Sequence, residues 1–159
     1  TEDAPFIFCL LNSPGWLQFI GDRGIHTLDD AIHYILSGPM KSYQENGFGL
    51  YLVKEKATGE KMGLCGLLKR ETLNEIDLGF AFLPEFNRKG YAIETATAIL
   101  DFARTELKVF KVLAITDNNN SKSIRLLEKL GFSFEKMIPW PASKDLKLFS
   151  INLKQYASK

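Results

Sequence analysis

The chain has 159 residues and a net charge of +1, with 45% hydrophobic and 25% charged residues. These values predict one compact globular domain over residues 1–159 with a sizeable core. The near-neutral charge argues against nucleic acid or an anionic membrane as the main partner, and no apolar run approaches the roughly 20 residues that a membrane span needs.

The two cysteines predict free thiols in a reducing compartment. Cys9 and Cys65 lie far apart and form no C-x-x-C pattern, so a disulfide framework is not expected. The start, Thr1–Pro5, lacks the basic region of a secretion signal. We therefore expect a cytoplasmic protein whose cysteines act as small apolar side chains.

The first third of the sequence predicts helices. The first is expected over Asp3–Asn12, and Pro14 follows it as a helix breaker. A second helix begins after Thr27, a favoured cap that two acidic residues follow in the first turn. Gly38-Pro39 interrupts this helix, which we expect to continue for a turn or two to Asn46.

Three strand patterns follow, and the short polar links between them favour an antiparallel meander. The strands are expected over Phe48–Lys54, Lys61–Arg70 and Glu75–Leu83. Gly79 in the third strand predicts a β-bulge or a close backbone approach.

Helices and strands alternate in the second half. Apolar residues recur at helical spacing from Ala92 to about Glu106. The nearly continuous apolar run Val109–Thr116 is typical of a central strand buried on both faces. The remaining elements are a helix over Ser123–Leu130, which Gly131 ends, and strands over Phe132–Ile138 and Leu146–Leu153, joined by a loop that holds Trp140. The alternation predicts an α/β domain built on one mixed sheet.

A candidate anion site lies in the segment from Leu83 to Ala92, where a strand ends and a helix begins. Helix N-termini present unpaired N–H groups and the positive end of the dipole, so a phosphate fits there. Gly90 permits a close backbone approach, and Arg88 and Lys89 add positive charge. A plain basic turn that caps a helix explains this short pattern equally well.

A second candidate segment is Asp117–Phe132. Asn120 and Ser123 are three residues apart and share one helix face. Asn120 acting only as a helix cap is the simpler interpretation. Capping alone, however, leaves Ser123 without a role.

In this order, and with a strand between them, the two segments resemble the GNAT acetyltransferase superfamily, most closely its ribosomal-protein N-terminal (Rim-type) branch. The resemblance covers nearly the whole chain. It rests on the following motifs: Asp77-Leu78-Gly79-Phe80, Pro84-Glu85-Phe86, Lys89-Gly90-Tyr91-Ala92-Ile93-Glu94, Asn120, Ser123-Ile124-Arg125 and Leu130-Gly131-Phe132. The implied fold is the GNAT fold, a mixed and mostly antiparallel sheet that is flanked by helices and splays after its third strand.

Three features depart from the family pattern. Asn87 stands where the loop usually has Gln or Arg, and Arg88 where this branch often has Gly. Because backbone amides do most of the phosphate binding, we expect binding to survive both changes. The family also opens with a strand before its first helix, and this strand is apparently missing. Either it is absent from this sequence or another segment covers the sheet edge, since an open edge invites pairing with another chain.

The resemblance implies transfer of an acetyl group from acetyl-CoA, without a metal, to a primary amine by direct attack in a ternary complex. The pantetheine is expected along the backbone of Phe80–Leu83, where an N–H polarises the thioester carbonyl. The residues implied in cofactor binding are Phe82, Leu83, Asn87, Arg88, Lys89, Gly90, Tyr91, Ala92, Asn120 and Ser123.

The same resemblance implies the catalytic groups. Asp77 is the expected base, directly or through water, and Ser123 is the expected proton donor to the departing thiolate. Glu75 is the second choice for the base, and Tyr91 is the weaker choice for the acid. Both acidic residues are explained almost as well as solvated strand residues.

Acceptor contacts are expected from Arg23, His26 and Trp140, in loops that face the acceptor site in this family. Trp16 and Phe19 are also candidates, although core packing is the simpler interpretation for both. The acceptor is a protein N-terminus or a small amine, including an aminoglycoside-like compound, and the protein is a monomer or a homodimer. The competing function is a non-catalytic acyl-CoA-binding module that keeps the phosphate loop but lacks a working base.

Overall fold

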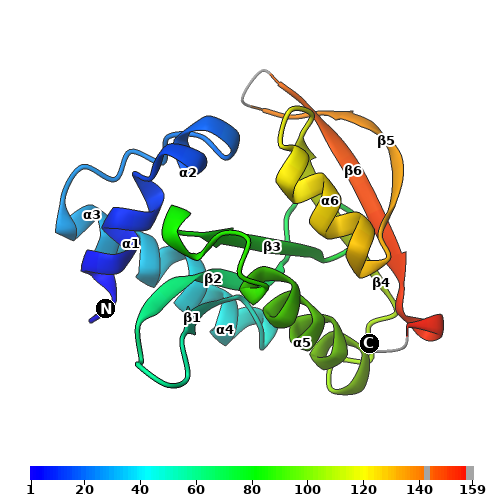
Figure 1. The fold of residues 1–159 in the computed structure, drawn as a ribbon, viewed down its shortest axis with the longest axis horizontal. Helices are drawn as coiled ribbons and strands as arrows, with labels where there is room; N and C mark the ends of the chain where they lie inside the picture. Colours follow the sequence, from blue (N-terminus) through cyan, green and yellow to red (C-terminus); the bar gives the residue numbers. More distant parts are fainter. Residues whose placement is uncertain (142–143, 157–159) are drawn as a thin grey trace.

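A computed structural model describes residues 1–141 and 144–156 of the chain. Six strands form one sheet in the order β1-β2-β3-β4-β6-β5 (Figure 1). The strands are β1 Leu50–Lys54, β2 Lys61–Leu68, β3 Asp77–Phe82, β4 Lys111–Asp117, β5 Ser133–Pro139 and β6 Asp145–Asn152. β3 and β4 are parallel and the other neighbouring pairs are antiparallel. This confirms the predicted mixed, mostly antiparallel sheet.

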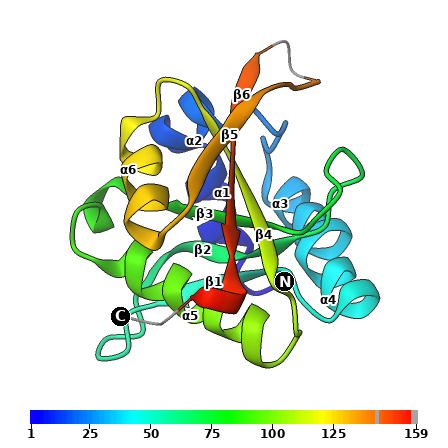
Figure 2. The same cartoon turned by 90° about the vertical axis from the view of Figure 1, so that its right-hand side faces the viewer.

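Helices cover both faces of the sheet (Figures 1 and 2). They are α1 Ala4–Leu11, α2 Pro14–Phe19, α3 Leu28–Ile35, α4 Lys41–Asn46, α5 Tyr91–Thr105 and α6 Ser121–Leu130. A π-helical turn, Leu36–Met40, joins α3 to α4, and single 3₁₀ turns occupy Pro84–Phe86 and Leu153–Gln155. None of these helices in the described ranges is long and apolar enough to cross a membrane.

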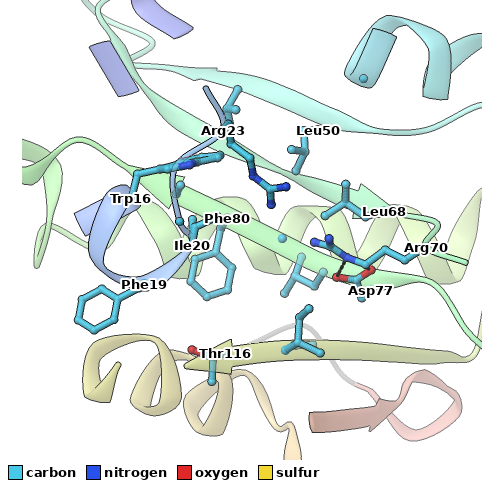
Figure 3. A pocket seen from close by; sticks show the side chains of 18 of the residues that line it. Trp16, Phe19, Ile20, Arg23, Leu50, Leu68, Arg70, Asp77, Phe80 and Thr116 are labelled. Carbon is cyan, nitrogen blue, oxygen red and sulfur yellow. Dashed lines mark hydrogen bonds and ion pairs between the residues drawn. The ribbon is translucent and has the colours of Figure 1, made fainter. Parts of the chain in front are cut away.

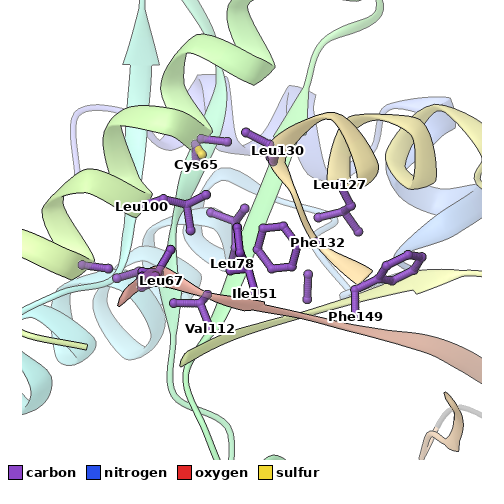
Figure 4. Close-up of a cluster of buried hydrophobic side chains, with 14 of the residues drawn as sticks. Cys65, Leu67, Leu78, Leu100, Val112, Leu127, Leu130, Phe132, Phe149 and Ile151 are labelled. Atoms are coloured by element: carbon purple, nitrogen blue, oxygen red, sulfur yellow. The ribbon is translucent and has the colours of Figure 1, made fainter. Parts of the chain in front are cut away.

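The core lies in two layers, one on each side of the sheet. The larger layer packs α5 and α6 against the sheet around Leu67, Leu100, Leu127 and Phe149 (Figure 4). The smaller layer packs α1, α2 and α3 against the opposite face. Cys65 is buried in the larger layer and Cys9 is exposed, and both are free thiols.

Most predicted elements are confirmed within two or three residues, and the N-terminal region holds the main correction. The sequence predicted only a helix break at Pro14, but α2 begins there. Proline is well suited to the first position of a helix because its ring fixes φ and its missing N–H would be unpaired anyway. The helix start at Thr27 is confirmed, since Thr27 and Asp30 form a reciprocal capping box.

Gly79 makes room for a side chain and marks neither a bulge nor a close backbone approach. The register between β2 and β3 runs without a shift from Gly63↔Phe82 to Leu68↔Asp77, so the bulge alternative is wrong. A Cβ on Gly79 would lie 2.6 Å from Cδ1 of Leu68. The glycine therefore makes room for that side chain.

Part of α4 covers the outer edge of β1. Within the described residues, the first strand of the sheet in chain order is β1, which forms one edge. Tyr43 donates a hydrogen bond to the carbonyl of Leu50, and its ring stacks on Tyr51 with centroids 5.3 Å apart. A helix side chain thus occupies the start of an edge that would otherwise be open to pairing.

The sheet splits between β3 and β4. These strands pair at one register position, Asp77↔Leu113, and Leu113 donates its N–H to the carbonyl of Ile76 at 2.9 Å. β4 instead pairs with β6 over its whole length, from Lys111 to Asp117. The parallel strands therefore separate toward their C-terminal ends, as the resemblance implied.

Candidate active site

A cavity of about 680 Å³ lies where β3 and β4 separate. Its walls come from α2 and the loop that follows it, α3, β3, β4, the start of α6, and the segment before β6 (Figure 3). Residues of β1, β2, α4 and the link after β2 also line the cavity, so elements from both halves of the chain meet where two neighbouring strands separate. Such switch points in open sheets are common ligand sites.

The backbone of β3 presents polar groups to this gap. Leu83 donates its N–H across to Met62 of β2 at 2.9 Å. Because successive residues of a strand point their N–H groups to opposite sides, Phe82 and Phe80 direct theirs toward β4. Since β4 pairs with β3 only at Asp77, these groups are free to bind an extended ligand.

The N-terminus of α5 has the backbone features that an anion site needs. Gly90, its N-cap, has φ +86°, and Arg88 has φ +63°, so both lie in the left-handed region. Within the described residues, the N–H groups of residues 88–93 donate no hydrogen bond. A 15-residue helix thus directs its dipole and a run of free donors at one exposed loop.

Side chains hold this loop in place. The Tyr91 hydroxyl donates to Oε1 of Glu55 at 3.0 Å, which fastens the start of α5 to the link between β1 and β2. The Tyr91 ring meets Phe86 edge-on, and the Lys89 ammonium lies 5.6 Å from the centre of the Phe86 ring. The hydroxyl of Tyr91 is therefore engaged in a structural contact and does not line the cavity.

Asp77 lines the cavity and is fully buried. Nε of Arg70 donates to both carboxylate oxygens at 3.1 Å. Burial raises the pKa of Asp77 to about 6, and the Arg70 guanidinium opposes this rise. A carboxylate can accept about four hydrogen bonds, so the oxygens of Asp77 can still accept hydrogen bonds from a ligand.

The two candidate bases differ in position. Glu75 is exposed and is not part of the cavity lining, whereas Asp77 is buried in it. Ala81, two alternations after Asp77 on β3, packs against the α1–α3 layer. Because side chains alternate along a strand, Asp77 faces that same side.

Asn120 and Ser123 both line the cavity at the start of α6. Oδ1 of Asn120 accepts the N–H of Ser123 at 3.2 Å, so the helix-cap interpretation of Asn120 is confirmed. The Ser123 hydroxyl makes no hydrogen bond among the described residues. It is therefore a free donor at the wall of the gap.

The predicted acceptor residues separate in the structure. Arg23 and Trp140 line the cavity, and the Arg70 guanidinium lies 5.6 Å from the centre of the Trp140 ring. His26 is exposed and is not part of the lining; its backbone N–H bonds the Asp30 carboxylate at the start of α3. The structure thus brings two of the three to one cavity and leaves His26 outside it.

The aromatic candidates serve both packing and the cavity. Trp16 is buried in the α1–α3 layer and also lines the cavity, and Phe19 joins it there (Figure 3). Nε1 of Trp16 is buried and has no hydrogen-bond partner in the described part of the chain. An indole N–H without an acceptor is uncommon in a protein interior.

Several lining residues were not found from the sequence. They are Tyr34, Arg70, Thr116, Asp117 and Lys144. Arg70 and Asp77 flank the link between two antiparallel strands, so their proximity had a signal in the hairpin spacing. Asp117 and Lys144, whose charged atoms lie 3.2 Å apart, are separated by 27 residues and had none. Among the described residues, no three His, Cys, Asp or Glu side chains are placed to hold a metal ion.

Comparison with known protein families identifies the class. The family model for the acetyltransferase (GNAT) domain matches residues 1–133. The chain therefore belongs to the GNAT acetyltransferase family, in which acetyl-CoA is the acyl donor.

Similar curated proteins come from bacteria. The chain is 36% identical over 98 residues to the uncharacterized protein YkkB of Bacillus subtilis, and 32% identical over 104 residues to its uncharacterized N-acetyltransferase YjdG. These matches span 59% and 65% of this chain but only 57% and 62% of the two relatives. Spermidine N(1)-acetyltransferase of Escherichia coli is 35% identical over 78 residues, which is 48% of this chain and 42% of that protein.

Solved structures share the fold. An acetyltransferase from Agrobacterium tumefaciens has a TM-score of 0.80 at 22% identity and covers 96% of this chain and 86% of its own. A spermidine N-acetyltransferase from Vibrio cholerae, in complex with CoA and spermine, has a TM-score of 0.79 at 21% identity, with 98% and 92% covered. Ribosomal-protein-S5-alanine acetyltransferase from Vibrio fischeri has a TM-score of 0.80 at 17% identity, with 98% and 91% covered. At these identities the likeness establishes the GNAT fold.

Proposed function

We propose that residues 1–159 form a single catalytic domain that transfers an acetyl group from acetyl-CoA to a primary amine. The observation that carries this proposal is the gap between β3 and β4. It opens into a cavity of about 680 Å³ with free backbone donors on β3, and the unpaired N–H groups at the start of α5 follow β3 after a short link. A cofactor whose pantetheine arm joins a pyrophosphate to a terminal thioester suits this arrangement.

The cofactor is proposed to bind in two parts. Its pyrophosphate contacts the N–H groups of residues 88–93, and Arg88 and Lys89 supply positive charge. The pantetheine then runs along β3, where the backbone at Phe80 and Phe82 offers alternate donors and acceptors. Phe82 ends β3 and Leu83 follows it toward the start of α5, and neither residue lines the cavity.

Asp77 is the proposed base. The acceptor reaches the cavity as an ammonium, which must lose a proton before its lone pair can attack the thioester carbonyl. Asp77, which is buried on the acceptor side with a pKa of about 6, is ionised at neutral pH and can accept that proton directly or through water. A backbone N–H of β3 stabilises the oxyanion that forms during attack.

Ser123 is the proposed acid. When the tetrahedral intermediate collapses, the CoA thiolate leaves and takes a proton from the Ser123 hydroxyl, which regains one from the attacking nitrogen directly or through water. The Ser123 hydroxyl lines the cavity and has no partner among the described residues. Tyr91 is the weaker candidate because its hydroxyl bonds Glu55 outside the cavity.

The proposed acceptor is a primary amine, and the available similarities favour two different kinds. Resemblance to the ribosomal-protein N-terminal branch favours a protein N-terminus, whereas the partial match to a spermidine N(1)-acetyltransferase favours a small amine. The loop after α2 and the segment before β6, which carry Arg23 and Trp140, are proposed to choose between them.

Thiol release from acetyl-CoA, followed with a thiol dye across a panel of amines, tests the proposal. We expect release that requires both an amine and the protein. CoA binding without turnover on any amine would instead favour the non-catalytic acyl-CoA-binding module, in which Asp77 and Arg70 serve only as a structural ion pair.

A further inference from the structure

Building on the proposed acetyl transfer, we propose that the acceptor is a small primary amine that carries an anionic oxygen group, a carboxylate or a phosphate, next to its amine. The Arg23 guanidinium and the free face of the Arg70 guanidinium form the seat for this anion. Neither the family nor the relatives assign such a seat to this chain.

The charges that line the cavity carry the first step. Five cationic side chains line it, against three carboxylates. Each carboxylate already has a cationic partner: Asp77 has Arg70 at 3.1 Å, Asp117 has Lys144 at 3.2 Å, and Glu45 has Lys41 at 3.7 Å. Among the described residues, Arg23 and Lys69 are left without a carboxylate partner. The cavity therefore holds surplus positive charge.

Two arginines converge on one part of the wall. Arg23 comes from the loop after α2, and Arg70 from the link after β2. Figure 3 shows both side chains reaching into the pocket from opposite sides. Only Nε of Arg70 bonds Asp77, so its two terminal nitrogens make no hydrogen bond in the described chain. Planar guanidinium groups bind carboxylate and phosphate oxygens in pairs, so this pair suits an oxyanion.

The pKa of Tyr34 indicates that both arginines lie near this part of the cavity wall. Burial raises the pKa of its phenol, while the positive charges of Arg23 and Arg70 oppose that rise. Both guanidinium groups therefore act on a phenol that itself lines the cavity. The unpaired indole N–H of Trp16 belongs to the same wall as Arg23 and is a further donor that lacks an acceptor. The terminal nitrogens of Arg70 and the indole N–H of Trp16 thus have no acceptor among the described residues, as expected where a ligand supplies the oxygens.

The position of Arg70 sets the spacing within the acceptor. One guanidinium both holds Asp77 through Nε and offers its terminal nitrogens to the cavity. An anion bound to the terminal nitrogens of Arg70 therefore lies close to the carboxylate of Asp77, the proposed base. The amine that Asp77 deprotonates must therefore stand close to the anion, as in an α- or β-amino acid or an amino-phosphate.

A polyamine fits this cavity poorly. Asp77 takes its reacting amine, but the other ammonium groups also need carboxylates, and Glu45 and Asp117 are already paired with lysines. Two unpaired cations in the wall would repel such a ligand. The chain thus differs in recognition from relatives that act on spermidine.

Matched pairs of acceptors test the inference, because they separate the effect of the acceptor's anionic group from the effect of the basicity of its amine. The pairs are L-phenylalanine with L-phenylalaninamide, and O-phosphoethanolamine with ethanolamine; spermidine is the polyamine probe. The amide has the more easily deprotonated amine, so basicity alone would favour it. We expect kcat/KM for the acid to exceed that for the amide by about tenfold or more, because an anion on arginine gains charge-assisted hydrogen bonds. The phosphate pair separates a phosphate seat from a carboxylate seat.

Arg23→Gln is the decisive variant because it removes the charge from an exposed loop residue. We expect it to reduce the preference for the anionic acceptor toward unity, while CoA affinity measured by calorimetry stays within about twofold. Arg23→Lys should keep part of the preference. Lys136→Gln, which makes the same change of charge on the exposed strand β5 outside the cavity, should leave it intact.

The possible outcomes separate the inference from the function on which it rests. Turnover that is faster with the amide, ethanolamine or spermidine than with the anionic acceptors would overturn the inference and leave the acetyltransferase proposal standing. An anion preference that survives Arg23→Gln would overturn the seat. Absence of CoA binding would instead overturn the proposed function itself.

Discussion

At the scale of the residue, Asp77 shows how one side chain is tuned by two opposing effects. Full burial favours its neutral form, and the Arg70 guanidinium at 3.1 Å favours the charged form. Burial dominates, and the resulting pKa of about 6 lies close to working pH, where a general base is most effective. The resemblance indicated Asp77 but not its partner Arg70, although the antiparallel pairing of the strands on either side of their link brings the two residues together.

Asp77→Asn tests the base. We expect kcat to fall by about a hundredfold or more, because general-base catalysis contributes on that order, while CoA affinity changes by less than about twofold. Steady-state thiol release and CoA calorimetry measure the two effects. Glu75→Gln is the matched control, since Glu75 is exposed and outside the cavity. Unchanged turnover in the Asp77 variant would remove it as the base.

The pH dependence follows from the same pKa. Asp77 must be ionised to accept a proton, so activity is present above about pH 6 and is lost as pH falls through that value. A profile of kcat/KM against pH in the wild type should therefore bend on the acidic side near pH 6. Activity that does not fall as the pH drops well below 6 would contradict this prediction.

At the scale of the element, the start of α5 depends on backbone conformation and not on side-chain space. Gly90 has φ +86°, and a Cβ there would meet nothing within 4 Å. A larger residue therefore costs strain of about 1–2 kcal/mol or more in the left-handed region, without any clash. The sequence indicated the helix start after Gly90, because Gly before a helix start carries a local signal. It missed α2, because a proline reads equally as a break or as a first helical residue.

Gly90→Val should abolish CoA binding or weaken it at least about tenfold, because relief of the strain turns the N–H groups of residues 88–93 away from the phosphate. The fold should persist. Gly59→Val imposes similar strain in the link between β1 and β2, with φ +74° and no atom within 4 Å, and should leave CoA affinity unchanged. Calorimetry on both variants, with their thermal unfolding, checks this; equal affinity in the Gly90 variant would refute the loop assignment.

Two glycines in the sheet predict opposite tolerance. A Cβ on Gly66 would overlap the backbone carbonyl of Gly49, whereas a Cβ on Gly79 would meet only the end of the Leu68 side chain at 2.6 Å. Gly66→Ala should cost about 3 kcal/mol or more of unfolding free energy, because backbone cannot yield, and Gly79→Ala about 1 kcal/mol. Urea unfolding of both variants measures the difference. Similar losses for the two would contradict the packing described around β2.

At the scale of the molecule, the proposed function depends on a sheet in which two neighbouring strands, β3 and β4, are paired at only one position. β4 pairs with β6 along its length and with β3 at one position, so the space between β3 and β4 is left for a ligand. Apolar periodicity predicted nearly every strand and helix, because burial imposes it locally. It did not predict contacts such as Asp117–Lys144, since partners 27 residues apart leave no local pattern. The family resemblance predicted the gap between the strands. Which charged side chains line that gap could be determined only from the folded structure.

Titration of CoA into the protein by calorimetry tests the central claim most directly, since every proposed step requires the cofactor in the gap between β3 and β4. We predict saturable binding of about one CoA per chain, with a dissociation constant in the micromolar range or tighter. Heats no larger than those of dilution, from a protein shown to be folded by its cooperative unfolding, would contradict the account.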